Sequence, residues 1–345
     1  MTSAPAHSHA PLRPVPGLRT VSIVGTGSYV PERVLTNKDL ERMVDTTDEW
    51  IVSRTGMKER RIAAPDQATS DLATEAARRA LADAGVKADD VDLLIVATIT
   101  PDFPFPNTAC LVQHKIGARR ASCMGLEAAC SGFLYAVETA RHFIATGAAN
   151  TALVIGAETM TSILDWKDRS TCVIFGDGAG AVVLQARGAP RGIISTVLGA
   201  DGSLSELLLV PAGGSRRPAT AATVDQRLHF LKMSGREVFR HAVTCMTRAA
   251  KEALSRAGMT TADVRWVIPH QANMRIIQAI GERLAVPPEK LVINVEKYGN
   301  TSAASVGLAM DEAARDGRLQ KGDVVLSLVF GGGFTWGATL LEWYK

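Results

Sequence analysis

The sequence predicts an α/β protein in which two similar halves build alternating layers of helices and sheets. The first observation is an internal repeat, because residues 77–96 and 250–269 share Ala, Ala-Leu, Ala-Gly and Asp-Val in register. The second is the alternation of amphipathic helices with continuous apolar strands, which is typical of buried, largely parallel sheets. The third is composition: alanine and glycine are abundant and aromatic residues make up only 5%, so helices can pack closely on sheets.

Each copy of the repeat is expected to form an amphipathic helix that ends at a glycine, then a short polar loop and an apolar strand. A second, less exact correspondence follows each copy, in which a helix is again followed by a strand. After Cys130 we expect a helix to about residue 146 and a strand at 152–155. After Asn300 we expect a helix of small residues and a strand at 324–330.

The chain is therefore divided into three segments. Residues 1–18, rich in proline and small polar residues, are expected to form a disordered tail. Residues 19–189 form the first half, and residues 190–345 form the second. Two such halves would pack about a pseudo-two-fold axis, which would place loops of both halves side by side and permit a site assembled from distant segments.

Charge and cysteine content narrow the function classes. With 38 basic and 35 acidic residues, the net charge of +3 is too small to suggest a nucleic-acid binder. The five cysteines contain no Cys-x-x-Cys pair, which favours a reducing cytoplasm. No stretch reaches the about 18 uncharged apolar residues that span a bilayer. We expect a soluble cytoplasmic protein with neither a nucleic-acid nor a membrane partner, and without a metal site.

Cys130 is the strongest candidate for a catalytic residue. It lies between an apolar strand and the helix that begins at Ser131, and its small neighbours leave room for a substrate. A helix N-terminus offers unpaired N–H groups and the positive end of the helix dipole, which favour a nucleophilic thiolate. The alternative is a buried structural cysteine. We assign that role to the other four, Cys110, Cys123, Cys172 and Cys245.

Further segments carry residue types that thioester chemistry can use. His270 follows the apolar strand 266–269, at the strand end where α/β sheets place ligand-contacting groups. Asn300 lies between turn signals and a helix, where an N-cap or turn role is an alternative. The glycine run 331–333 would let a backbone N–H approach an oxyanion, or would form a flexible turn. Residues 177–180 lack the Lys-Ser/Thr of a phosphate loop, so we expect a structural turn.

Taken together, six segments resemble the β-ketoacyl-acyl carrier protein synthase III family of the thiolase superfamily. The resemblance runs from about residue 21 to 344. The resemblance rests on six motifs, which are, in order, WIVSRTG (50–56), ACSGF (129–133), FGDGAG (175–180), HQAN (270–273), YGNTS (298–302) and GGGFTWG (331–337). The resemblance implies a thiolase-like layered αβαβα fold and an acyltransferase that initiates fatty acid biosynthesis.

By resemblance, the reaction is a decarboxylative Claisen condensation in two half-reactions. An acyl-CoA, expected to be acetyl-CoA, acylates Cys130; malonyl-acyl carrier protein then loses carbon dioxide, and its carbanion attacks the acyl group. His270 and Asn300 are the other catalytic residues and would hydrogen-bond the malonyl thioester oxygen. The backbone N–H groups of Cys130 and Gly332 would form the oxyanion hole. CoA is a substrate, so no cofactor is implied.

The resemblance also implies a set of substrate-binding residues. Trp50 would stack on the adenine of CoA, with Arg169 on the opposite face. Arg54 and Thr55 would contact CoA phosphates or the base. The other residues implied are Asn273 at the pantetheine, Gly235 and Phe239 in the tunnel wall, and Phe105. For Trp50 and Phe105, ordinary packed or surface rings are the alternative.

Two of these assignments imply protein partners. Phe105 matches a residue that closes the acyl pocket from across the interface of a homodimer. Arg275 matches an arginine that docks the acidic carrier protein, although a solvated helix face would also explain it. Residues 282–283 are Glu-Arg where other family members often have lysines, so the docking surface is altered. The segment 212–226 looks long and suggests a mobile lid or rim.

Three rival functions remain at this stage. A related starter condensing enzyme of secondary metabolism would share the motifs. A catalytically silent acyl-CoA-binding paralogue would not need Cys130, His270 and Asn300 together. A papain-like Cys-His-Asn hydrolase would need the His to activate the thiol, and the duplicated α/β pattern fits it poorly.

Overall fold

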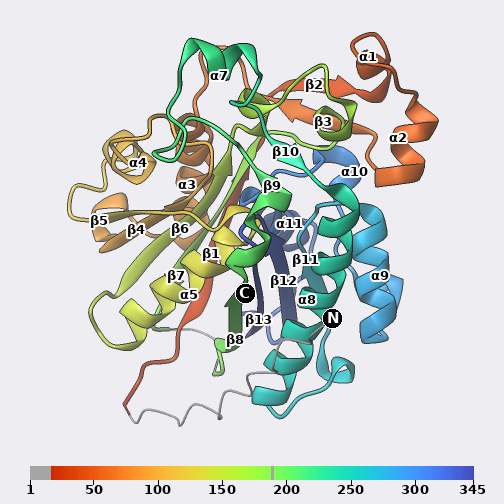
Figure 1. Cartoon of the computed structure of the whole chain (residues 1–345). Coiled ribbons are helices and arrows are strands. Elements are labelled where there is room, and N and C mark those ends of the chain that lie inside the picture. The colour runs from red at the N-terminus through yellow and green to blue at the C-terminus, as the bar shows by residue number, and fades with distance from the viewer. Residues whose placement is uncertain (1–16, 188–189) are drawn as a thin grey trace.

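The computed structural model describes residues 17–187 and 190–345, which fold into five alternating layers (Figure 1). An outer helical layer, a first sheet, two central helices, a second sheet and another helical layer follow one another. This order confirms the thiolase-like layered α/β fold expected from the sequence. The tail expected at 1–18 lies outside the described residues, apart from its last two positions.

The first sheet has the strand order β1-β7-β6-β4-β5. β4 pairs in parallel with β5 and β6, whereas β7 pairs antiparallel with both β6 and β1. The strands are β1 (Ser22–Tyr29), β4 (Leu93–Ala97), β5 (Ser122–Leu126), β6 (Thr151–Glu158) and β7 (Gly178–Gln185).

The second sheet has the order β11-β12-β13-β8, and only β11 and β12 are parallel. Its strands are β8 (Ile193–Ala200), β11 (Trp266–Pro269), β12 (Val324–Gly331) and β13 (Thr335–Glu342). The expectation of largely parallel sheets is therefore wrong, because both sheets are mixed. The strands are apolar because helices cover both faces of each sheet, and that burial does not depend on strand direction.

Helices cover the outer faces of the sheets and fill the space between them (Figure 1). The first sheet is covered by α3 (Thr69–Ala84) and α4 (Thr108–Ile116). The second is covered by α8 (Gly235–Arg256) and α9 (Met274–Leu284). The central pair is α5 (Gly132–Ala145) and α11 (Ala304–Arg315), whose buried side chains share one core with strands of both sheets.

The internal repeat appears as the same succession of elements in each half. α3, a 3₁₀ turn and β4 correspond to α8, a 3₁₀ turn and β11. Gly85 and Gly258 follow the two helices with φ angles of 65° and 64°, a left-handed conformation that glycine adopts without strain. The second half has a reduced counterpart of β5, a parallel bridge between Val267 and Leu291. The two copies of the repeat therefore have the same local structure and corresponding places in the two sheets.

The remaining elements are short. The helices among them are α1 (Asn37–Glu41), α2 (Asp48–Thr55), α6 (Arg169–Cys172), α7 (Ala221–Asp225) and α10 (Val295–Tyr298). The strands are β2 (Arg33–Thr36), β3 (Glu59–Ile62), β9 (Leu208–Leu209) and β10 (Lys232–Met233). The 3₁₀ turns are Ala88–Asp90, Ala129–Ser131, Met160–Ile163, Gly202–Leu207, Thr261–Asp263 and Pro288–Lys290. Within the described ranges, no helix combines the length and apolarity needed to cross a membrane.

Glycines let the two halves approach each other where α11 packs on β7. A Cβ atom on Gly180 would lie 2.5 Å from the carbonyl carbon of Gly307. The structural turn expected at 177–180 is wrong, because Gly178 to Gly180 begin β7 and their small size serves helix packing. Asp177, just before the strand, accepts hydrogen bonds from the backbone N–H groups of Ala63 and Thr161.

The long segment 212–226 forms an exposed excursion that carries α7. Its base is closed by a 2.9 Å hydrogen bond from the backbone N–H of Ala212 to the carbonyl of Leu228. No residue of the segment lines either cavity at Cys130. In this structure the excursion therefore lies outside both cavities.

Candidate active site

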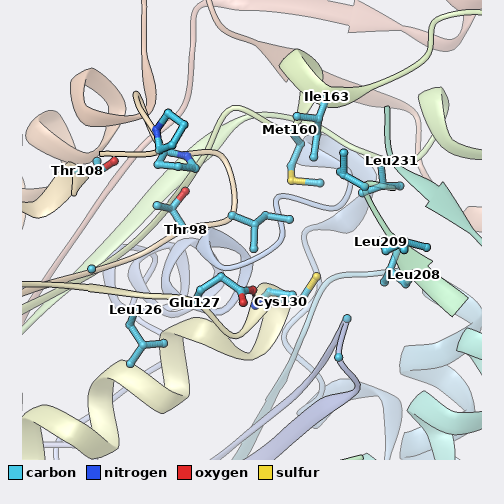
Figure 2. A pocket seen from close by; sticks show the side chains of 18 of the residues that line it. Thr98, Thr108, Leu126, Glu127, Cys130, Met160, Ile163, Leu208, Leu209 and Leu231 are labelled. Carbon is cyan, nitrogen blue, oxygen red and sulfur yellow. Dashed lines mark hydrogen bonds between the residues drawn. The ribbon is translucent and has the colours of Figure 1, made fainter. Parts of the chain in front are cut away.

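Cys130 lies in a 3₁₀ turn that connects β5 to α5. The preceding residue, Ala129, has a φ angle of 46°, a left-handed conformation that costs a residue with a side chain about 1 kcal/mol. This turn directs the Cys130 sulfur into a cavity, although the residue as a whole is only 7% exposed (Figure 2). The sequence predicts a cysteine at a helix N-terminus, and the structure places Cys130 just before α5. The cysteine itself lies in a strained 3₁₀ turn that leads into this helix.

The glycine run of the second half lies directly behind Cys130. A Cβ atom on Gly331 would lie 2.7 Å from the backbone nitrogen of Cys130, so no other residue fits there. Two hydrogen bonds fix the contact: the Thr335 hydroxyl donates to the carbonyl of Ala128 at 2.9 Å, and the Ser131 hydroxyl donates to the carbonyl of Thr335 at 3.0 Å. Gly332 lines the same cavity as Cys130.

Two cavities meet at Cys130. One, of about 650 Å³, has a largely apolar lining that includes Leu126, Met160, Ile163, Leu208 and Leu231 (Figure 2). The other, of about 530 Å³, contains His270 and Asn300 beside Cys130 and extends to Trp50 and Arg169. A substrate could therefore reach the sulfur through one cavity and place an apolar chain in the other.

His270 follows the last residue of β11, and its backbone N–H donates to the carbonyl of Leu328 on the neighbouring strand at 2.7 Å. The side chain is buried, and its Nδ1 atom lies 2.5 Å from the hydroxyl oxygen of Ser305 on α11. Burial lowers the pKa of His270 to about 3, so the imidazole is neutral at physiological pH. A neutral ring can donate one hydrogen bond while it accepts another.

Asn300 is fixed by three hydrogen bonds. Its backbone N–H donates to Ile174, its carbonyl accepts from Gly176, and its side-chain Oδ1 accepts from the backbone N–H of Ser302 at 2.9 Å. The amide nitrogen Nδ2 forms no hydrogen bond with the described residues, and Asn300 lines the cavity that contains His270. The side chain therefore presents a donor to a molecule in that cavity.

Burial dominates the acidity of the nucleophile. It raises the pKa of the Cys130 thiol to about 12, although a hydrogen bond from Ser302 acts in the opposite direction. Burial of Cys130 therefore opposes the effect expected of the helix terminus on its thiol.

Glu158, at the end of β6, is a buried carboxyl group close to Cys130. Its oxygens accept hydrogen bonds from the hydroxyls of Thr98, Thr100 and Ser302 at 3.0, 2.6 and 3.0 Å. The backbone N–H groups of Ile99 and Thr100 also donate to it. Burial raises the pKa of Glu158 to about 7 in spite of these donors.

The residues expected to bind CoA gather at the outer end of the second cavity. The guanidinium of Arg169 lies 5.1 Å from the centre of the Trp50 ring, and that of Arg54 lies 5.8 Å from it. Thr55 lines the cavity, but its hydroxyl donates to the carbonyl of Ile51 and is therefore occupied by its own helix. A Thr55 contact to CoA would have to come from other atoms of the residue.

The wall of this cavity comes from α8 and α9. Gly235 and Phe239 on α8 face Asn273 and Arg275, which open α9. Asn273 caps α9 by accepting from the N–H of Arg275 at 2.8 Å, and its amide donates to the carbonyl of Arg54 at 3.1 Å. The Arg275 guanidinium lies 5.7 Å from the Phe239 ring. These four residues therefore surround the entrance.

Phe105 does not line the larger cavity at Cys130, and the residue is 88% exposed. Its neighbours Phe103 and Pro104 do line that cavity, so Phe105 stands beside the rim. An exposed phenylalanine at this place is what a residue reaching into a second copy of the chain would require.

Sequence reasoning missed Glu158 and Ser305, and it gave no separate role to Ser302 and Gly331, which lie within the matched motifs. Ser302 and Ser305 lie four and seven positions after Tyr298, where the matched motif starts, so their place in YGNTSAAS was a usable signal. Glu158 had a weaker signal, a carboxylate at the end of an otherwise apolar strand. Among the described residues, no cluster of three or more potential metal ligands occurs.

Comparison with known proteins supports one family. Residues 124–202 match the family described as 3-oxoacyl-[acyl-carrier-protein] synthase III, and residues 254–343 match its C-terminal part. A β-ketoacyl-[acyl-carrier-protein] synthase III of Caldanaerobacter subterraneus subsp. tengcongensis is 54% identical over 323 residues, which are 94% of this chain and 98% of the relative.

Solved structures of the same family are similar to this chain. The 3-oxoacyl-[acyl-carrier-protein] synthase III of Aquifex aeolicus is 48% identical, with a TM-score of 0.87 over 94% of this chain and 100% of that protein. The priming β-ketosynthase of the R1128 polyketide biosynthetic pathway is 37% identical, with a TM-score of 0.88 over 97% of this chain and 99% of that protein. Full-length relatedness of this degree shows that the chain belongs to the β-ketoacyl-acyl carrier protein synthase III family.

Proposed function

We propose that this protein condenses an acyl-CoA with malonyl-acyl carrier protein through an acyl-Cys130 intermediate and so initiates fatty acid biosynthesis. The observation that carries the proposal is the position of Cys130 at the junction of two cavities, with His270 and Asn300 on one side. The products are 3-oxoacyl-acyl carrier protein, CoA and carbon dioxide. The covalent intermediate divides a difficult step into two easier ones.

In the first half-reaction, the Cys130 sulfur attacks the thioester carbonyl of the acyl-CoA. The backbone N–H groups of Cys130 and Gly332 stabilise the oxyanion of the tetrahedral intermediate. Gly331 supports this arrangement because its lack of a side chain allows the strand to lie against the nucleophile. The acyl chain then occupies the apolar cavity shown in Figure 2.

In the second half-reaction, His270 and Asn300 donate hydrogen bonds to the malonyl thioester oxygen while carbon dioxide leaves. The free Nδ2 group of Asn300 supports this role. Nδ1 of His270 lies 2.5 Å from the Ser305 hydroxyl oxygen. With that hydroxyl as the donor, the ring proton is on Nε2, which is then the second donor to the substrate. Neutral donors suit this step because a carboxylate would repel the developing enolate.

Acyl-CoA enters along Trp50, Arg54 and Arg169, and the carrier protein docks at Arg275. The adenine would insert between Trp50 and Arg169, whose stacking at 5.1 Å supports a shared aromatic and cationic surface. Thr55, Gly235, Phe239 and Asn273 form the rest of the tunnel. The reaction as proposed needs no cofactor and no metal, because CoA is a substrate.

The proposed assembly is a homodimer in the cytoplasm. Phe105 supports the dimer, since an 88% exposed phenylalanine beside the rim of the acyl cavity would be covered by a second copy. Five free cysteines suit a reducing compartment. We also propose the division into halves at about residue 190, with the nucleophile in the first half and His270 and Asn300 in the second.

One experiment tests the catalytic proposal. The protein is incubated with acyl-CoAs from acetyl to octanoyl, the mass of the Cys130 peptide is measured, and malonyl-acyl carrier protein is then added. We expect an acyl adduct on Cys130 that disappears as 3-oxoacyl-carrier protein forms, and no adduct with Cys130→Ser. Absence of any acyl adduct on the wild-type peptide would refute the proposal, and adducts without condensation would indicate the acyl-CoA-binding alternative.

Likeness to the R1128 priming ketosynthase favours a second candidate, a starter condensing enzyme of secondary metabolism. The two candidates differ in their carrier protein. Condensation rates are compared with a fatty-acid carrier and with a polyketide carrier. Arg275→Glu should raise KM for the preferred carrier, whereas Arg119→Glu, at a residue that lines neither cavity at Cys130, serves as the control.

A further inference from the structure

Glu158 is a buried carboxyl group that contacts both halves of the chain. It is the last residue of β6 in the first half and is fully buried. Its Oε1 atom accepts from the hydroxyl of Ser302 at 3.0 Å, and Ser302 lies in the loop before α11 in the second half. The condensation mechanism gives Glu158 no task of its own. A carboxyl group is costly to bury unless it is hydrogen-bonded, so its partners show which segments it holds.

The loop before α11 lies directly against the end of β6. A Cβ atom on Gly156 would lie 2.2 Å from the carbonyl oxygen of Ala303, so a side chain at this position of β6 would push the loop away. Ser302 has a φ angle of 47°, a left-handed conformation that residues with a side chain rarely adopt. The hydrogen bond to Glu158 ties its side chain to β6 in this conformation. β6 and Glu158 therefore fix where the backbone of Ser302 lies.

The backbone N–H of Ser302 in turn holds the side chain of Asn300. It donates to Oδ1 of Asn300 at 2.9 Å. Because a backbone N–H can only donate, the atom that faces it must be the amide oxygen and not the amide nitrogen. This contact sets which way the amide is turned, and it leaves Nδ2 as the donor that Asn300 offers to the cavity. Two consecutive hydrogen bonds that share Ser302 thus connect Glu158 to Asn300.

We propose that Glu158 is a positioning residue for decarboxylation, because it holds Ser302, and Ser302 holds the Asn300 amide with its Nδ2 donor toward the malonyl thioester. The inference rests on the proposed function, in which that donor stabilises the enolate as carbon dioxide leaves. Once the connection is broken, the amide is free to rotate and to present Oδ1, an oxygen that would repel the enolate. Glu158 itself does not need to reach the substrate.

The other oxygen of Glu158 has a separate set of partners. Oε2 accepts from the hydroxyls of Thr98 and Thr100 at 3.0 and 2.6 Å. It also accepts from the backbone N–H groups of Ile99 and Thr100, both at 3.1 Å. These bonds attach the loop after β4 to the same carboxyl group. Removing the Ser302 hydroxyl therefore releases the second half alone and leaves the loop after β4 in place.

The test compares the two half-reactions in Ser302→Ala. Acylation of Cys130 and decarboxylation of malonyl-acyl carrier protein are first measured in the wild type. Absence of either reaction there would refute the proposed function, whereas the variants decide the positioning role. In Ser302→Ala we expect decarboxylation to slow about tenfold, the effect of one lost hydrogen bond, and the acylation burst to stay within about twofold.

Glu158→Gln should show the same selective loss. The two backbone N–H groups of the loop after β4 require an acceptor, so they keep the amide oxygen of the new side chain on their side. Its amide nitrogen then faces the Ser302 hydroxyl and cannot accept from it. A wild-type decarboxylation rate in Ser302→Ala or in Glu158→Gln would overturn the proposal.

A double variant tests whether Ser302 acts through Asn300. In an Asn300→Ala background, the further change Ser302→Ala should slow decarboxylation by no more than about twofold, because the group that it positions is already absent. A further loss of about tenfold in that background would show that Ser302 acts independently of Asn300, and the proposal would then be wrong.

Thr26→Val is the matched control. Thr26 is also buried, and its hydroxyl donates at 2.7 Å to the carboxylate of Asp311 in the other half. Neither of these residues lines a cavity at Cys130. Both half-reactions of Thr26→Val should stay within about twofold of the wild type. Equal losses of both half-reactions in Ser302→Ala, or the same selective loss in Thr26→Val, would overturn the proposal and leave Glu158 as a structural contact between the halves.

Discussion

The Nδ1 atom of His270 lies 2.5 Å from the hydroxyl oxygen of Ser305, with both side chains buried between β11 and α11. A hydroxyl that donates to Nδ1 holds the ring proton on Nε2, where the substrate can use it. Ser305→Ala should slow decarboxylation about tenfold, equivalent to about 1.4 kcal/mol, the size of one hydrogen bond. Acylation of Cys130 should change little. Separate assays of the two half-reactions check this, Ser305→Thr should restore the rate, and equal losses in both would contradict it.

Replacement of Asn300 by Asp tests the donor role of its amide. Asp keeps an oxygen that accepts from the N–H of Ser302, so the loop should remain in place. It exchanges the free Nδ2 donor for a second carboxylate oxygen, which would repel the enolate. We expect decarboxylation to fall by at least about 100-fold, with a much smaller loss in the acylation burst. If the acylation burst were lost to the same degree, the role assigned to Asn300 would be wrong.

The two glycines behind Cys130 should respond differently to an added methyl group. In Gly331→Ala the new Cβ would lie 2.7 Å from the nitrogen of Cys130 and 3.0 Å from that of Ser131, neither of which can move independently. In Gly332→Ala the nearest atom is the carbonyl of Leu208 at 3.2 Å. We expect Gly331→Ala to abolish acylation and to destabilise the fold by about 1–3 kcal/mol.

Mass measurement of the Cys130 peptide and thermal unfolding check this prediction. Gly332→Ala, the milder variant, should unfold within a few degrees of the wild type. Wild-type acylation by Gly331→Ala would show that the close approach is not required.

Glu158 should make stability depend on pH. Its pKa is about 7 in the folded protein and near the ordinary 4.5 when unfolded, so the folded state holds the extra proton between these values. The contribution of Glu158 to stability is therefore fully present below pH 4.5 and is lost as pH rises through 7. Relative to Glu158→Gln, the wild type should lose about 3 kcal/mol of unfolding free energy across this window.

Urea unfolding of both proteins at several pH values measures this difference. The opposite contribution of His270, whose pKa is lowered, cancels because both proteins carry it. A constant difference across the window would contradict a raised pKa at Glu158.

Removal of the arginine that stacks on Trp50 should weaken acyl-CoA binding without changing the chemistry. Arg169→Ala deletes a guanidinium 5.1 Å from the Trp50 ring. We expect KM for acyl-CoA to rise about fivefold, near 1 kcal/mol, with an unchanged saturated acylation rate. Arg265→Ala is the control. It removes a guanidinium that lies 5.4 Å from the centre of the Trp266 ring, a pair that does not line the cavity, and it should leave KM unchanged. A lower saturated rate in Arg169→Ala would point to a different role.

Much of the fold could be predicted because its signals are local. The repeat at 77–96 and 250–269 predicts helix, turn and strand in both halves, and the structure places them at equivalent positions. Strand direction could not be predicted, because apolar strands report burial on two faces and not the direction of their neighbours. The local pattern at 178–180 predicts a turn, because the packing partner of Gly180, which is Gly307, is distant in sequence.

For the site, the sequence by itself determined which residues are available: the cysteine in its small-residue segment, the histidine after a strand and the asparagine before a helix. Only the tertiary structure decided their protonation. The pKa values of Cys130 and His270 depend on burial, and the network of Glu158 with Ser302 depends on a contact between the two halves. Electrostatic energies are set by distance and solvent exclusion in space, so no local stretch of sequence contains them.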